Sequence, residues 1–115
     1  MNISDFNGLA FNYKRYNCLH HVARVRRAAG LTMPHVSTPD HRSDVNSVID
    51  GCKKSRNFEQ VKTPENFDIV VIIGPIGHVG VYVDGMVSHC SAASRCVVLD
   101  RVDEFKKLEF YRVSL

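Results

Sequence analysis

No apolar run in this 115-residue sequence approaches the roughly 18 residues of a transmembrane helix, so we expect no membrane insertion. The first residues, MNISDFNGLAFNYKRYN, lack the basic segment and the apolar segment of a secretory signal, so we expect no signal peptide. Internal repeats and low-complexity tracts are also absent. With 44% apolar and 23% charged residues, the chain is expected to form one globular domain over residues 1–115.

The spacings typical of metal sites are missing as well. Four cysteines and six histidines are present, but no two of them stand in C-x-x-C or H-x-x-x-H spacing. Nothing marks the chain for export, so a disulfide scaffold is not expected either. We therefore predict no metal and no other cofactor, with most of the cysteines reduced and buried. Zinc bound tightly to the purified protein would support the opposite interpretation.

The excess of basic residues is small, with a net charge of +3. We interpret the short basic clusters as solvated surface, and a weak preference for anionic partners such as cell-wall polymer is the alternative. No basic stripe interleaved with aromatic residues is present, so we predict no nucleic-acid partner. The clusters are Arg24, Arg26 and Arg27, then Lys53, Lys54 and Arg56, then Lys106 and Lys107.

The order of the expected elements, helices first and antiparallel strands after them, predicts an α+β domain. A helix is predicted over 17–29, because Asn17 is a favoured N-cap and Gly30 a favoured residue after a helix. A loop over 31–40 leads to a second helix over 43–54, where apolar residues recur at helical spacing. The expected strands, by their β-branched and alternating pattern, are 68–73, 78–83, 86–91, 96–100 and 108–113.

The stretch HVGVYVDGMVSH begins at His78, ends at His89 and predicts a hairpin that turns at Asp84-Gly85. This register makes the two histidines diagonal neighbours on one face of the hairpin. Gly80, on the same face, leaves room beside His89. One imidazole of such a pair can act as a base while the other orients it. The simpler interpretation is that both histidines decorate the surface of a sheet.

Cys18 stands at the first position of the first predicted helix, where backbone amides and the helix dipole favour a thiolate. Val22, Val25 and Ala29 follow it at helical spacing, so Cys18 is expected to face the sheet. An inward thiol can be an inert core residue, but a thiol aimed at a histidine pair has the geometry of a nucleophile. The cysteines predicted to be structural are Cys52, Cys90 and Cys96.

Three blocks, YNCLHHVARVRRAAG, ENFDIVVI and GHVGVYVDGMVSHC, resemble the signature blocks of the NlpC superfamily of papain-like cell-wall cysteine peptidases. The resemblance covers roughly residues 6 to 113 and is strongest to short phage tail-associated hydrolases. It implies a papain-like fold in which N-terminal helices pack on a five-stranded antiparallel sheet. It also implies that Cys18 is the nucleophile, His78 the base and His89 the orienting residue. Asp68 matches the aspartate that begins a strand in the family.

The resemblance further implies a cysteine peptidase or amidase that cleaves peptidoglycan stem peptides as part of a phage tail tip. The backbone amide of Cys18 is the expected oxyanion donor, and Tyr13, Tyr16 and Asn17 are further oxyanion or substrate candidates. Packing is the alternative role of the two tyrosines. Expected partners are peptidoglycan peptides and other tail proteins, in the virion or in the bacterial cytoplasm before assembly. Two alternatives remain: a structural tail-tip or tail-assembly protein with little or no activity, and an acyltransferase or deamidase with the same site.

Overall fold

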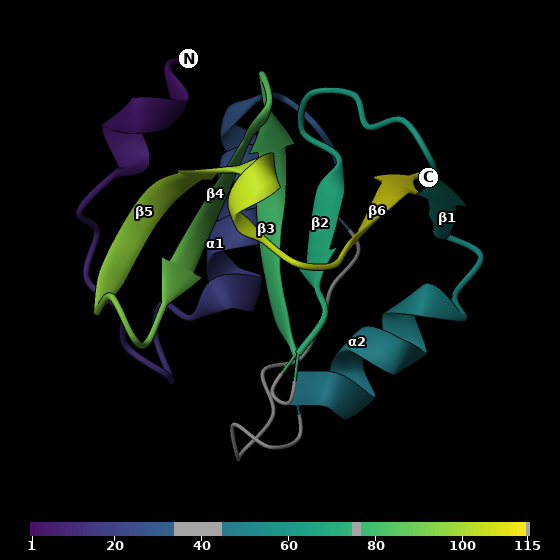
Figure 1. Cartoon of the computed structure of the whole chain (residues 1–115), viewed down its shortest axis with the longest axis horizontal. Helices are drawn as coiled ribbons and strands as arrows, with labels where there is room; N and C mark the ends of the chain where they lie inside the picture. The colour runs from purple at the N-terminus through teal and green to yellow at the C-terminus, as the bar shows by residue number, and fades with distance from the viewer. Residues whose placement is uncertain (34–44, 75–76, 115) are drawn as a thin grey trace.

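The computed structural model describes residues 1–33, 45–74 and 77–114. In this part of the chain, two α-helices and six strands form an α+β domain (Figure 1). The helices are α1 (Cys18–Ala28) and α2 (Val45–Lys53), with short 3₁₀ helices η1 (Ile3–Phe6) and η3 (Val102–Glu104). The strands are β1 (Phe58–Val61), β2 (Ile69–Ile72), β3 (His78–Val83), β4 (Met86–Ser91), β5 (Cys96–Arg101) and β6 (Leu108–Val113). None of the described helices is long and apolar enough to cross a bilayer.

Every predicted strand is present, with bounds within one residue of those expected, but the number five is wrong. The sixth strand is β1, which pairs with β6 at the edge of the sheet. Its sequence, FEQV, is short and exposes its two central residues, so it carries little of the apolar signal of a strand. Of the expected helical and loop segments, 34–40 of the loop and 43–44 of the second helix lie outside the described residues.

The strand order is β1-β6-β2-β3-β4-β5, and each paired neighbour is antiparallel. Strands β2 to β5 form the expected meander, but β6 does not continue it beside β5. Instead the chain returns through η3 across one face of the sheet, and β6 pairs with β2. Figure 1 shows this crossing in front of β3 and β4, with α1 behind them. The two faces of the hairpin are therefore covered by different parts of the chain.

Helix α1 is held at both ends by local hydrogen bonds. The Oδ1 atom of Asn17 accepts from the backbone amides of Leu19 and His20, and His20 Nδ1 accepts from the amide of Asn17. At the other end, Gly30 has a φ of 78° and closes the helix in a Schellman motif. The N-cap fixes Cys18 at the first helical position, as predicted.

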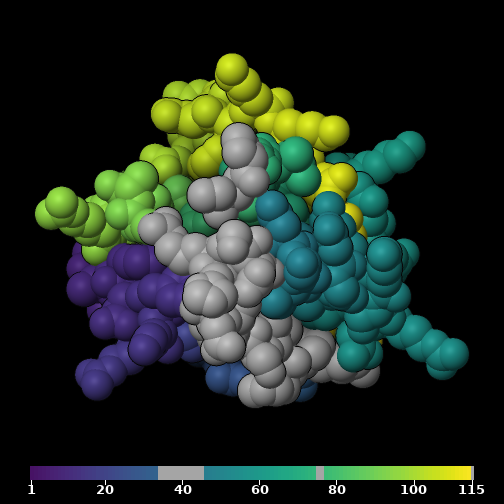
Figure 2. All heavy atoms as spheres, turned by 90° about the horizontal axis from the view of Figure 1, so that it is seen from below, coloured from purple at the N-terminus to yellow at the C-terminus, as the bar shows by residue number. Residues whose placement is uncertain are grey.

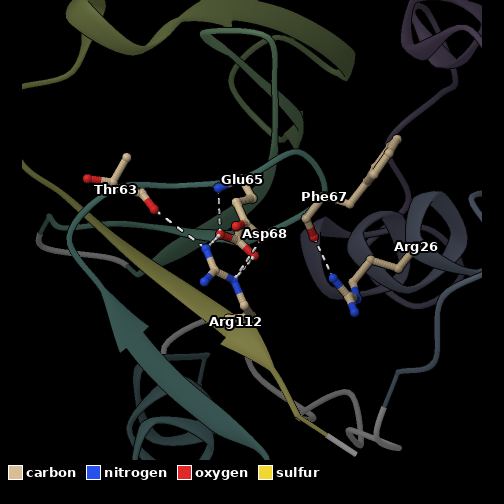
Figure 3. A network of polar contacts seen from close by, with 6 residues as sticks. All are labelled: Arg26, Thr63, Glu65, Phe67, Asp68 and Arg112. Atoms are coloured by element: carbon tan, nitrogen blue, oxygen red, sulfur yellow. Dashed lines mark hydrogen bonds and ion pairs between the residues drawn. The ribbon is translucent and has the colours of Figure 1, made fainter.

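The core lies between α1 and the sheet. Val22 and Val25 of the helix pack against the strands, where Val79 and Val81 are also buried. The prediction that Arg26 belongs to a solvated surface cluster is wrong, because this residue is only 5% exposed. Its guanidinium donates a hydrogen bond to the carbonyl oxygen of Phe67 (Figure 3). It also donates to the carbonyl oxygen of Thr32, so the buried charge has hydrogen-bond partners.

The start of β2 is fixed by polar contacts at the end of the hairpin away from His78. Phe67 has a φ of 73°, a strained value for a bulky residue, and its amide donates to the carbonyl of Tyr82 at 2.7 Å. The buried carboxylate of Asp68 accepts from Arg112 Nη2 at 2.8 Å (Figure 3). The aspartate that matches the family motif therefore has a structural role, which is to anchor β2.

The segment over 8–11 covers the outer edge of β5. Three backbone hydrogen bonds of 2.9–3.0 Å hold it there. The amides of Gly8, Val97 and Phe11 donate to the carbonyl oxygens of Val97, Leu9 and Arg95, respectively. Figure 2 shows the purple N-terminal residues against the light-green strand region at one side of the molecule. This segment gives the edge strand a short antiparallel partner.

Candidate active site

The hairpin has the predicted turn and register. Asp84 and Gly85 have φ values of 50° and 82°, as a type I′ turn requires. With the strands paired in this register, His78 and His89 lie on one face, and His78 Nε2 is 2.8 Å from His89 Nδ1. The two ring planes meet at 75° with centroids 5.0 Å apart. The predicted diagonal contact between the histidines is confirmed.

His89 also contacts a carboxylate that sequence reasoning missed. Its Nε2 lies 2.8 Å from Asp100 Oδ2. In the register of β4 and β5, His89 pairs with Val98, so Asp100 is again a diagonal neighbour on the same face. His78, His89 and Asp100 thus form a polar row across three adjacent strands. The sequence contained a signal for this contact. A short turn that pairs Ser91 with Cys96 also pairs His89 with Val98, which places Asp100 diagonally next to His89.

Cys18 and one member of the polar row line the same pocket, which has a volume of about 200 Å³. Both Cys18 and His78 line the pocket, one at the N-terminus of α1 and the other at the start of β3. The thiol residue is only 7% exposed, and the helix dipole favours its ionised form. The other described lining residues are Phe11, Tyr13, Asn17, Gly77, Cys90, Ser91, Ala92 and Ala93.

The three oxyanion or substrate candidates have different positions. Tyr13 and Asn17 line the pocket, but both polar atoms of the Asn17 side chain are engaged, in the helix cap and with the Tyr13 carbonyl oxygen. Tyr16 is outside the described lining, and its hydroxyl lies 2.7 Å from His21 Nδ1. We therefore assign Tyr16 to packing. Asn17 supports the site by fixing the helix start, which leaves Tyr13 and the Cys18 amide as oxyanion candidates.

Cys90, predicted to be structural, lines the same pocket as Cys18. Burial, together with the nearby Cys18 and Cys96, raises the pKa of Cys90 to about 11. Its Sγ donates to the carbonyl oxygen of Tyr16 at 3.4 Å. At neutral pH Cys90 is therefore a protonated thiol, which is a poor nucleophile. All four cysteines are described, and none of them forms a disulfide.

His21 is a second residue that sequence reasoning missed. It is completely buried. Its Nδ1 lies 2.7 Å from the hydroxyl oxygen of Tyr16, and its Nε2 lies 2.8 Å from Ser88 Oγ. Burial, with His89 and Arg24 nearby, lowers the pKa of His21 to about 4. A neutral His21 thus joins α1 to β4 from the face opposite His89. The available signal was its place three residues after Cys18, on the helix face that also carries Val22 and Val25.

Gly80 makes room for His89 on the adjacent strand. A methyl group there would lie 2.7 Å from Val87 Cγ1, 2.8 Å from the Ser88 carbonyl oxygen and 3.1 Å from His89 Cβ. We expect Gly80→Ala to reduce the free energy of unfolding by about 1–3 kcal/mol and to displace His89.

Urea unfolding followed by circular dichroism measures this loss. Gly51→Ala is the matched control, because the added methyl on α2 meets nothing within 4 Å and alanine favours a helix. Equal stability of Gly80→Ala and the unchanged protein would contradict the close packing around His89.

Within the described ranges, no group of three or more histidine, cysteine or acidic side chains is arranged to hold a metal ion. Neither a family model, nor a curated protein, nor a solved structure matches the chain. At the pocket, the structure brings together a thiol at a helix N-terminus and a histidine that belongs to the polar row.

Proposed function

We propose that the protein is a thiol hydrolase of the NlpC type that cleaves amide bonds in peptidoglycan stem peptides, as a component of a phage tail tip. The observation that supports this best is that Cys18 and His78 line one pocket, with His89 Nδ1 2.8 Å from His78 Nε2. The sequence blocks that resemble the family contain these same three residues. Peptidoglycan is the substrate that this resemblance implies.

In the first half of the reaction, His78 takes the thiol proton of Cys18, and the sulfur attacks the carbonyl carbon of the substrate amide. The carbonyl π pair moves onto the oxygen, which the Cys18 amide at the helix start stabilises, with Tyr13 as a second candidate donor. When the pair returns, the C–N bond breaks, and His78 gives its proton to the leaving amine. The product is a thioester of Cys18.

In the second half, water attacks the thioester while His78 takes a proton from it. The C–S bond then breaks, the carboxylic acid leaves, and the thiol of Cys18 is restored. Throughout this cycle, His89 keeps the His78 ring in position through the 2.8 Å contact. Water is the only co-reactant, and the atoms balance as one amide plus one water giving one amine and one acid.

Digestion of purified muropeptides, followed by mass spectrometry, tests the proposal. The unchanged protein should convert a muropeptide into two fragments whose masses sum to the substrate plus one water, and Cys18→Ala should give none. Cys52→Ala is the control, because Cys52 is a half-buried residue of α2 outside the described pocket lining. Intact muropeptides after incubation with a folded, thiol-reactive protein would favour the structural tail protein instead.

A further inference from the structure

We propose that Asp100 is a positioning residue that fixes the protons of both histidines, so that His78 Nδ1 becomes the nitrogen that accepts the thiol proton of Cys18. This inference deepens the proposed function and rests on it. Its basis is the pair of contacts in the polar row, each 2.8 Å long, one between the two imidazoles and one between His89 and the carboxylate.

The proton positions follow from what each group can donate. An ionised carboxylate only accepts hydrogen bonds, so the Nε2 of His89 must carry a hydrogen and donate it to Asp100. A neutral His89 then has an unprotonated Nδ1, which can only accept. The partner of that atom is His78 Nε2, which must therefore donate. The remaining nitrogen of a neutral His78, Nδ1, has its lone pair available for a proton.

Without the carboxylate, the same geometry permits the reverse arrangement. His89 could carry its hydrogen on Nδ1 and donate to His78 Nε2, and His78 would then carry its own hydrogen on Nδ1. That arrangement leaves no lone pair on the nitrogen that must take the thiol proton. Asp100 also stabilises the positive charge of the row once His78 is protonated, since His89 passes the polarisation along two short hydrogen bonds.

Two titratable groups next to this row stay neutral near pH 7. Cys90 shares the pocket, but its pKa of about 11 keeps it neutral. His21 lies behind β4, and its pKa of about 4 keeps it neutral too. Phe105 packs against the ring of His89, with centroids 5.7 Å apart, and His89 is 6% exposed. Neither Cys90 nor His21 is therefore the cause of a change in Cys18 reactivity between about pH 5 and 8.

The nearest charged neighbours of Asp100 along the chain supply a control. Arg101 is paired with Asp103, and both side chains are about two-thirds exposed, at 67% and 65%. Asp103→Asn removes one negative charge three residues along the chain from Asp100 and keeps Asp100 and both histidines. A purely electrostatic effect of net charge would be similar in Asp103→Asn and in the Asp100 variants, whereas an effect of proton positioning would occur only in the latter.

The test measures alkylation of Cys18 by iodoacetamide from pH 5 to 8, located by mass spectrometry, and the tautomer of His89 from its ring ¹⁵N shifts. We expect Asp100→Ala to reduce the alkylation rate near pH 6 about tenfold and to remove the preference for Nε2–H. Asp100→Glu should restore part of the rate, and Asp103→Asn should leave it unchanged. Asp100→Asn, which keeps the shape of the side chain, should behave as Asp100→Ala does.

An unchanged rate and an unchanged His89 tautomer in Asp100→Asn would overturn the inference, and so would an equal loss in Asp103→Asn. The result is separable from the proposed function. Dependence of alkylation on Asp100 in a protein that cleaves no muropeptide would support the positioning role and reject the substrate. The opposite result is that the protein cleaves muropeptides, that Asp100→Asn is as active as the unchanged protein and that the His89 tautomer is unchanged. This result would support the substrate and reject the positioning role.

Discussion

Replacement of His78 by alanine should abolish the reactivity of Cys18 below neutral pH and reduce amide hydrolysis by about 10²- to 10⁴-fold. In the proposed mechanism, this imidazole is the base that takes the thiol proton and the acid that returns it to the leaving amine. Cys18 should then alkylate like an ordinary thiol, with a rate that rises only toward a pKa of about 8.5. His89→Ala should reduce Cys18 alkylation and amide hydrolysis less, because in the proposed mechanism His89 only orients His78 and exchanges no proton with the substrate.

The measurement is the pH dependence of Cys18 alkylation together with kcat/KM on a muropeptide. His20→Gln is a suitable control, because it removes an imidazole close to Cys18 while glutamine can keep the capping contact with the Asn17 amide. If His78→Ala leaves the alkylation profile as it was, Cys18 and His78 are not a working pair. The structural tail protein would then be the better interpretation.

Acidification from about pH 6.5 to about pH 4 should cost the protein about 3 kcal/mol of unfolding free energy through His21 alone. The pKa of His21 is lowered to about 4 in the folded protein, whereas an unfolded histidine titrates near 6.5. The unfolded chain therefore binds more protons than the folded one between these values. The stabilisation is complete above about pH 6.5, falls as the pH decreases and is lost by about pH 4.

Urea unfolding at pH 7 and at pH 4.5, followed by far-UV circular dichroism, measures this dependence. His21→Gln should be less stable than the unchanged protein at pH 7, by about 1–3 kcal/mol, because Tyr16 and Ser88 lose a well-placed partner. It should also lose less stability on acidification. An equal loss in both proteins would show that carboxylates, and not His21, dominate the acid response.

Local signals account for the parts of the structure that the sequence predicted best. The Asp84-Gly85 dipeptide determines its own turn, and the turn sets which residues of β3 and β4 are opposite. The contact between the two histidines follows from that register alone. In the same way, the Asn17 cap determines where α1 begins and hence the position of Cys18.

Features that depend on distant segments could not be predicted in this way. The return of β6 to the β2 edge is a pairing between strands far apart in the chain, and no turn between them specifies it. The burial of Arg26 depends on the carbonyl oxygen of Phe67, forty-one residues away. Tyr16, predicted as a possible oxyanion group, instead contacts His21, which is buried against Ser88 of β4, sixty-seven residues further along the chain.

The N-terminal segment beside β5 links the protection of a strand edge to the shape of the pocket that contains Cys18. An uncovered edge strand presents a row of backbone donors and acceptors that a second chain can extend into a larger sheet. Here the amide and the carbonyl oxygen of Val97 in β5 are bonded to the backbone of Leu9 and Gly8, and the amide of Phe11 donates to Arg95 just before the strand. Phe11 also lines the pocket that contains Cys18. Proteolytic loss of this segment would therefore widen the pocket of Cys18 and expose part of a strand edge to a second chain in the same event.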